Sequence, residues 1–91
     1  MALISREVLV SNRAGLHARA AVMVVQLANK YPCAILFQRQ EGTINAKSIM
    51  GILTLAAVKG TTLTLTAEGD RADEALQALA DLFDRKFDEG E

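Results

Sequence analysis

One histidine, His17, stands among residues whose types suit the binding of an anion. The segment Gly15-Leu16-His17-Ala18-Arg19-Ala20-Ala21 joins an expected strand to an expected helix, which places His17 at the helix cap. The first N–H groups of a helix lack carbonyl partners and lie at the positive end of its dipole, so they can hold phosphate oxygens. We therefore expect a phosphate site formed by His17 and the backbone N–H groups of Ala18, Arg19 and Ala20.

Two neighbours of His17 fit the same interpretation. Arg19 can place its planar guanidinium beside the bound phosphate, and Gly15 permits a tight backbone entry that a larger residue would strain. A lone histidine in a small protein is also compatible with a surface or cap position that carries no chemistry. The spacing of these residues alone leaves both interpretations open.

Ser48 stands at the start of a second, shorter helix. Its hydroxyl can accept a hydrogen bond from an N–H group in the first turn. A phosphate on Ser48 would add about −1.5 to −2 charge at a helix N-terminus, which favours the helix itself. We expect the apolar residues that follow, Ile49, Met50 and Leu53, to form a contact surface near His17, with the alternative that Ile49 and Met50 are core residues of the short helix.

Composition excludes several classes of function. The net charge of −1, with three phenylalanines and one tyrosine, offers neither the basic surface nor the stacking platform of a nucleic-acid binder. One histidine and one cysteine, Cys33, supply no catalytic triad and no metal-ligand spacing. We expect neither enzymatic machinery nor a metal or cofactor.

The length and hydropathy of the chain point to one small domain in the cytoplasm. Ninety-one residues suffice for a single core, so residues 1–91 are expected to form one domain with a frayed acidic tail at about 88–91. No run approaches the roughly 20 apolar residues that span a membrane. The opening MALISREV lacks the apolar stretch of a signal peptide, so the protein is expected to stay in the cytoplasm, away from membranes.

Residue periodicity predicts four strands and three helices. Strands are expected at Ile4–Val10, Ala34–Gln40, Thr43–Lys47 and Thr62–Ala67, with a turn at Glu41-Gly42. Helices are expected at Ala18–Asn29, Ser48–Leu55 and Ala72–Phe83. The order β-α-β-β-α-β-α indicates an α+β fold in which two long helices cover one face of a four-stranded sheet.

The opposite face of that sheet is expected to meet solvent. Strict alternation in Thr62–Ala67 puts Leu63 and Leu65 on one side and the threonines on the other. Periodicity does not choose between a ferredoxin-like strand order and another open-faced sandwich, because both use nearly the same sequence of elements.

The two motifs together resemble a known family. Gly15-Leu16-His17-Ala18-Arg19-Ala20 resembles the active-site signature of HPr, the histidine phosphocarrier family of the bacterial phosphoenolpyruvate-dependent sugar phosphotransferase system, and Lys47-Ser48-Ile49-Met50-Gly51 resembles its serine-site signature. The resemblance extends over nearly the whole chain. It implies an open-faced β-sandwich with a four-stranded antiparallel sheet and three helices on one face.

The resemblance also implies roles for individual residues. His17 would receive a phosphoryl group on its pros nitrogen, Nδ1, from enzyme I and pass it to enzyme IIA domains of sugar permeases, with Arg19 stabilising the phosphate. Ser48 would be the serine that the HPr kinase/phosphorylase modifies. Partners would dock on the residues Val22, Ile49, Met50 and Leu53. The protein would act as a monomer.

Two positions depart from the family's pattern. Ala20 stands where proline is usual, and Val22 stands where a smaller residue is common. Alanine in place of a first-turn proline loses rigidity worth about 0.4–1 kcal/mol. Ala20 also adds a backbone N–H, which bonds either to the His17 ring or to a bound phosphate, and we hypothesise the second.

Two related functions share the implied fold. One is a carrier that serves a purely regulatory phosphorelay, and the other is a regulatory binding module that is never phosphorylated. His17 argues against the binding module, because that module needs no phosphoryl acceptor. The regulatory carrier shares its local chemistry with a sugar-transport carrier, so only the partners distinguish these two.

Overall fold

The computed structural model describes residues 3–40 and 42–89. The elements follow the predicted order, which is β1 (Leu3–Leu9), α1 (Ala18–Ala28), β2 (Ala34–Arg39), β3 (Gly42–Asn45), α2 (Ile49–Thr54), β4 (Thr62–Glu68), α3 (Ala72–Asp84) and a terminal 3-10 turn, η1 (Lys86–Asp88). The predicted bounds differ from the observed ones by at most two residues. Glu41, half of the predicted turn, lies outside the described residues.

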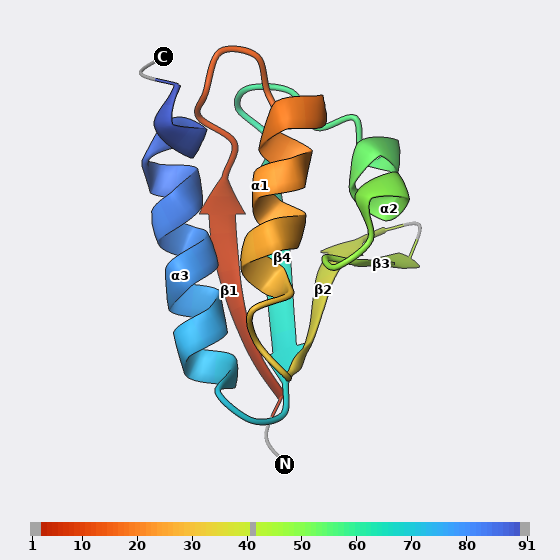
Figure 1. Ribbon diagram of the computed structural model, residues 1–91. Helices are drawn as coiled ribbons and strands as arrows, with labels where there is room; N and C mark the ends of the chain where they lie inside the picture. The colour runs from red at the N-terminus through yellow and green to blue at the C-terminus, as the bar shows by residue number, and fades with distance from the viewer. Residues whose placement is uncertain (1–2, 41, 90–91) are drawn as a thin grey trace.

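The four strands form one antiparallel sheet in the order β1-β4-β2-β3. The last strand therefore pairs with both the first and the second, with Leu63 opposite Val8 and Leu65 opposite Phe37. In Figure 1, α1 and α3 run across one face of this sheet, and α2 packs against α1 and β3. Periodicity had left open a ferredoxin-like strand order and another open-faced sandwich, and the observed order confirms the second.

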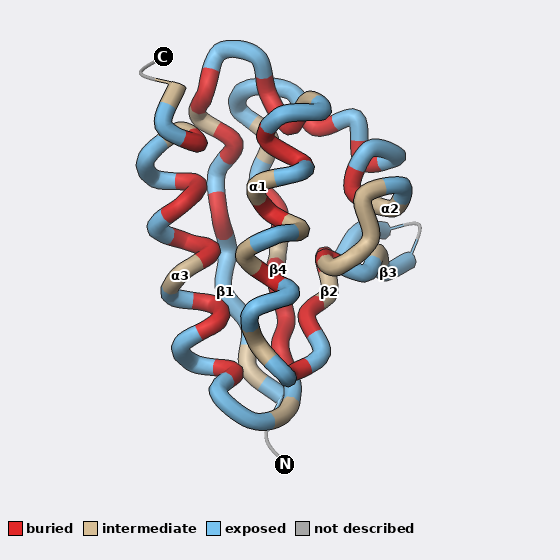
Figure 2. Tube along the Cα trace, viewed as in Figure 1, coloured by how far each residue is buried: buried red, intermediate tan, exposed pale blue. Residues whose placement is uncertain are grey.

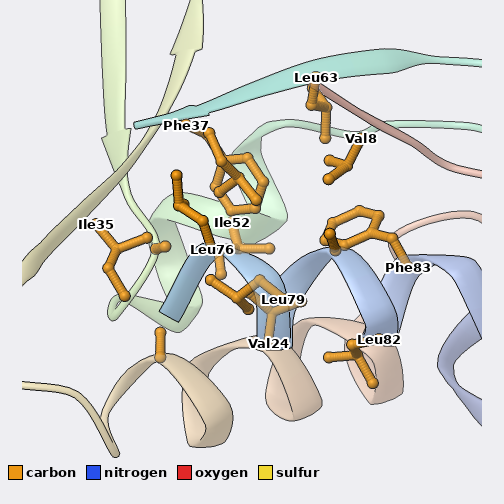
Figure 3. Packing of buried hydrophobic residues seen from close by; sticks show 14 of the residues in the cluster. Val8, Val24, Ile35, Phe37, Ile52, Leu63, Leu76, Leu79, Leu82 and Phe83 are labelled. Carbon is orange, nitrogen blue, oxygen red and sulfur yellow. The ribbon is translucent and has the colours of Figure 1, made fainter. Parts of the chain in front are cut away.

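The core lies between the sheet and the helices. Figure 3 shows Phe37 reaching down from the sheet toward side chains of α1 and α3, among them Val24 and Leu79. The ring of Phe37 meets that of Phe83 edge to face at 6.2 Å, and Phe83 meets Phe87 at 4.9 Å. Such edge-to-face pairs add about 0.5–1.5 kcal/mol beyond the burial of their area. Along both long helices, buried and exposed positions alternate as predicted (Figure 2).

The prediction that the threonine face of β4 meets solvent was wrong for one residue. Thr62 is exposed and Thr64 is half-buried, but Thr66 is only 5% exposed. Because β4 lies inside the sheet, Thr66 is flanked by Ser5 and Leu36 on the neighbouring strands. Its hydroxyl also accepts a hydrogen bond from the side-chain amide of Gln38 at 3.4 Å.

Asp88 and Glu89 are the part of the acidic tail that the structure describes, and they lie in the turn that follows α3. Phe87 is fully buried against Phe83 and anchors the segment that follows α3. Lys86, Phe87 and Asp88 all have positive φ angles, between 55° and 60°, which turn the chain sharply back. Residues other than glycine rarely adopt positive φ angles, which cost conformational free energy. The burial of Phe87 offsets that cost. In Figure 1, α3 ends at the end of the molecule at which α1 begins, and η1 follows it there.

Candidate functional site

His17 caps the first helix, as its position in the sequence predicts. Its backbone is extended, with φ −82° and ψ −174°, and its carbonyl oxygen accepts the N–H of Ala21 at 2.8 Å. Its ring nitrogen Nδ1 accepts a hydrogen bond from the backbone N–H of Arg19 at 3.2 Å. The ring thus lies over the first turn of α1, with about a third of the side chain (36%) open to solvent.

A tight turn before His17 delivers it to this position. Gly15 has φ +73°, and a Cβ atom placed on it would lie 2.6 Å from the carbonyl oxygen of Ala57. That oxygen accepts the N–H of Leu16 at 2.8 Å, so the loop after α2 supports the His17 loop from behind. The expected role of Gly15 is confirmed, and its cause is both the backbone conformation and the close approach of a second loop.

Glu89 joins His17 through a contact that the sequence analysis did not anticipate. Its carboxylate oxygen Oε2 lies 2.6 Å from His17 Nε2 and 3.2 Å from Arg19 Nη1. The other oxygen, Oε1, accepts a hydrogen bond from the side-chain amide of Asn12 at 2.9 Å. We call these four residues, Asn12, His17, Arg19 and Glu89, the histidine cluster.

The two members that sequence reasoning missed carry no local signal of their role. Asn12 lies in a polar loop, and Glu89 lies in an acidic tail that is 72 positions from His17. The tail approaches the ring only because Phe87 is buried, and the carbonyl oxygen of Phe87 also accepts a hydrogen bond from Arg19 Nη1 at 3.0 Å. The one sign in the sequence is that an aromatic residue, Phe87, stands between the charged residues Lys86 and Asp88, since an apolar side chain in a charged tail favours packing against the core.

The hydrogen bonds of the ring assign its tautomer. Nδ1 accepts the Arg19 N–H and so carries a lone pair, which leaves the ring hydrogen on Nε2 to be donated to Glu89. A lone pair on Nδ1 makes that nitrogen the nucleophile of a neutral imidazole. The site therefore presents a nucleophilic nitrogen at the positive end of a helix.

The histidine cluster lowers the pKa of Glu89 below its ordinary value of 4.5. The largest cause is the hydrogen bond from Asn12, followed by the one from His17, while burial opposes both and smaller electrostatic interactions with His17 and Arg19 add to the lowering. Because folding favours the ionised carboxylate, this stabilisation is present above pH 4.5 and is lost as the pH falls through the lowered pKa of the folded state.

Glu89→Gln should therefore reduce the acid sensitivity of the fold. The free energy of unfolding of the parent should fall more steeply below pH 4.5 than that of the variant, as measured by urea unfolding across the acidic range. Asp88→Asn, which removes a neighbouring carboxylate outside the histidine cluster, serves as the control. Equal slopes for the parent and Glu89→Gln would contradict the prediction.

Ser48 caps α2, as predicted. Its hydroxyl oxygen accepts the N–H of Gly51 at 3.2 Å, and its side chain is half-buried at the helix start. Among the apolar residues predicted to form a contact surface, Met50 is 70% exposed, Val22 is 41% exposed and Leu53 is 40% exposed. Ile49 is half-buried and packs against the core, so only part of its side chain is available to a contact surface.

Two further observations bear on the class of site. Within residues 3–40 and 42–89, no three His, Cys, Asp or Glu side chains are arranged to hold a metal ion. No helix in the same ranges combines the length and hydropathy needed to cross a membrane.

Comparison with known proteins decides the family. A family model described as "PTS HPr component phosphorylation site" matches residues 4–85. The chain belongs to the HPr family. The phosphocarrier protein HPr of Pseudomonas aeruginosa is 49% identical over 86 residues, which cover 93% of this chain and 96% of that protein.

Solved HPr structures share the fold as well. HPr-C-His from Thermoanaerobacter tengcongensis superposes with a TM-score of 0.89 at 42% identity, covering 94% of this chain and 97% of that one. HPr from Bacillus anthracis superposes with a TM-score of 0.83 at 46% identity, covering 89% and 96%. The α+β sandwich is therefore the HPr fold, and the protein is a phosphocarrier rather than an enzyme.

Proposed function

We propose that this HPr-family chain accepts a phosphoryl group on Nδ1 of His17 from phosphorylated enzyme I and donates it to enzyme IIA domains of sugar permeases. It acts as a monomer in the cytoplasm. The single observation that carries the proposal is the hydrogen bond that His17 Nδ1 accepts from the backbone N–H of Arg19 at the start of α1, in the place that a phosphoryl group would take.

The chemistry of the site suits a group that must move in both directions. A bond between phosphorus and an imidazole nitrogen is readily broken, whereas a serine ester would hold the group too firmly. The helix N-terminus contributes about 0.3–1 kcal/mol to a surface anion, which stabilises the phosphoryl group without trapping it. On phosphorylation, the Arg19 N–H changes its acceptor from Nδ1 to a phosphate oxygen, while Ala18 and Ala20 offer the adjoining N–H groups.

Phosphorylation by enzyme I tests the proposal directly. The chain is incubated with phosphoenolpyruvate and catalytic amounts of enzyme I, and its mass is measured before and after acid treatment. We expect a gain of one phosphoryl group that acid removes, because a phosphoramidate bond is acid-labile and a serine ester is not. A chain that gains no acid-labile group under these conditions is not a carrier of this type.

Ala20→Pro examines the departure from the family's pattern. The His17 ring is already engaged by the Arg19 N–H, so the N–H of Ala20 is assigned to the bound phosphate. Removing that donor should shorten the lifetime of the phosphohistidine about fivefold, the effect of a hydrogen bond to a charged group at a partly exposed site. The lifetime of the phosphohistidine is followed by mass spectrometry at neutral pH. An unchanged lifetime would contradict the hypothesis that the Ala20 N–H binds the phosphate.

Phosphorylation of Ser48 by the HPr kinase/phosphorylase is proposed to act on docking rather than on the fold. A phosphate on the cap of α2 favours the helix but places a charge beside the apolar residues Met50 and Leu53, which are exposed. Together with Val22 and Ile49, these residues form the proposed docking surface for enzyme I and enzyme IIA. Desolvating the new charge would weaken the complex.

Ser48→Asp should keep the stability of the protein and slow phosphoryl transfer from enzyme I about tenfold, through KM more than kcat. Ser48→Asn is the matched control, because asparagine also caps a helix but carries no charge. Transfer is measured at several concentrations of the chain. Equal KM values for the aspartate and asparagine variants would show that charge at this cap does not regulate docking.

A further inference from the structure

We propose that Glu89 is a positioning residue for His17, which holds the ring hydrogen on Nε2 and leaves Nδ1 as the nucleophile. This inference deepens the proposed function and rests on it. It assigns a role in phosphoryl transfer to a tail residue on the opposite side of the ring from the helix terminus.

Contacts to both oxygens hold the Glu89 carboxylate in place. Oε2 lies 2.6 Å from His17 Nε2, and Oε1 accepts the amide of Asn12 at 2.9 Å. Asn12 is fully buried, and the same amide nitrogen donates to the carbonyl oxygen of Gly15 at 2.8 Å. The carboxylate is thus tied to the turn that delivers His17, so its distance to the ring is set by backbone structure. A residue that only neutralised surface charge would need no such link.

The tail reaches the ring through a conformation that is held by packing. Three successive residues before Glu89 have positive φ angles, and the middle one, Phe87, is fully buried against Phe83. Arg19 Nη1 donates to the carbonyl oxygen of Phe87 at 3.0 Å as well as to Glu89. Strained backbone that persists at a site is a sign that surrounding contacts select it. Here those contacts hold the Glu89 carboxylate against Nε2 of His17.

The carboxylate suits the charge changes of the transfer step. The lone pair of Nδ1 forms the new bond to phosphorus, while the bond between phosphorus and the donor atom breaks and its electron pair stays on the donor. The His17 ring keeps its hydrogen on Nε2 and becomes cationic, and the Glu89 carboxylate offsets that charge at 2.6 Å. When the phosphoryl group leaves, the electron pair returns to Nδ1. No proton has to move at Nε2 in either direction.

Proton NMR of the unphosphorylated chain tests the contact without any partner. With nitrogen-15 labelling, the His17 Nε2–H should give a separate low-field resonance in the parent, because a hydrogen bond to a carboxylate deshields the proton and slows its exchange. Glu89→Ala should abolish this signal, and Asp88→Asn should leave it unchanged. Absence of the low-field signal in the parent, or its survival in Glu89→Ala, would overturn the proposal.

The rate of chemical phosphorylation tests the consequence. Phosphoramidate, a small phosphoryl donor that needs no protein partner, should phosphorylate His17 about tenfold more slowly in Glu89→Gln than in the parent. Glutamine keeps an acceptor of similar shape but lacks the charge, and urea unfolding verifies that the variant is folded. A rate equal to that of the parent, or faster, would overturn the proposal. If enzyme I fails to phosphorylate the parent, the proposed function fails, whereas the NMR and phosphoramidate results still decide the role of Glu89.

Discussion

His17→Asn should leave the protein folded and unable to take up a phosphoryl group from enzyme I. The side-chain oxygen of asparagine can accept the N–H groups of the first helical turn, as Nδ1 accepts that of Arg19, so the cap of α1 survives. The amide nitrogen of asparagine has no lone pair comparable to that of imidazole. We therefore expect complete loss of the acid-labile phosphoryl group, and a free energy of unfolding that falls only by the lost contact with Glu89, because the cap is kept.

His17→Ala is the matched variant, because it removes both the phosphoryl acceptor and the cap of α1. It should also lose the phosphoryl group, and it should unfold about 1 kcal/mol more easily, which is the typical cost of deleting a helix cap. Mass measurement and urea unfolding of the two variants separate the chemical role of His17 from its structural one. Acid-labile phosphorylation of His17→Asn would identify a different acceptor, and equal stabilities for the two variants would show that the cap contributes little.

Gly15→Ala should have the largest effect on stability of any single methyl addition near the site. The backbone of Gly15 is left-handed, and the added Cβ would lie 2.6 Å from the Ala57 carbonyl oxygen and 3.1 Å from the Cα of Val58. Both contacts are to backbone atoms, so relief requires one of the two loops to move. We expect a loss of about 2–4 kcal/mol, from the left-handed conformation and from the steric overlap together. Movement of Leu16 and His17 should also slow phosphoryl uptake.

Gly60→Ala isolates the steric part of that effect. Gly60 also has a positive φ angle, +95°, but a Cβ placed there meets no atom within 4 Å. Gly60→Ala should lower the free energy of unfolding by only about 1–2 kcal/mol, which is the cost of a left-handed backbone conformation, and it should leave phosphoryl uptake unchanged. Urea unfolding of both variants supplies the comparison. Equal losses of stability would show that the loop after α2 yields to the added methyl group and does not hold the His17 turn rigidly.

Elements and caps were predictable because their causes are local. The strict alternation in β4 and the stripe of apolar residues in α3 depend on periods of two and 3.6 residues, which neighbouring positions reveal. His17 and Ser48 stand directly before helices, where residues with side-chain acceptors belong. Gly15 was likewise expected at a tight turn, although the loop that approaches it could not be named.

The amino-acid sequence therefore sufficed for the order of the elements, the two caps and, through its motifs, the family. Tertiary packing decided the strand order β1-β4-β2-β3, and with it the burial of Thr66 on an inner strand. Tertiary packing also decided that Asn12 and Glu89 meet His17. The reason is physical: the tail is brought back by the burial of Phe87 against Phe83, and no periodicity or motif encodes a contact between residues 72 positions apart.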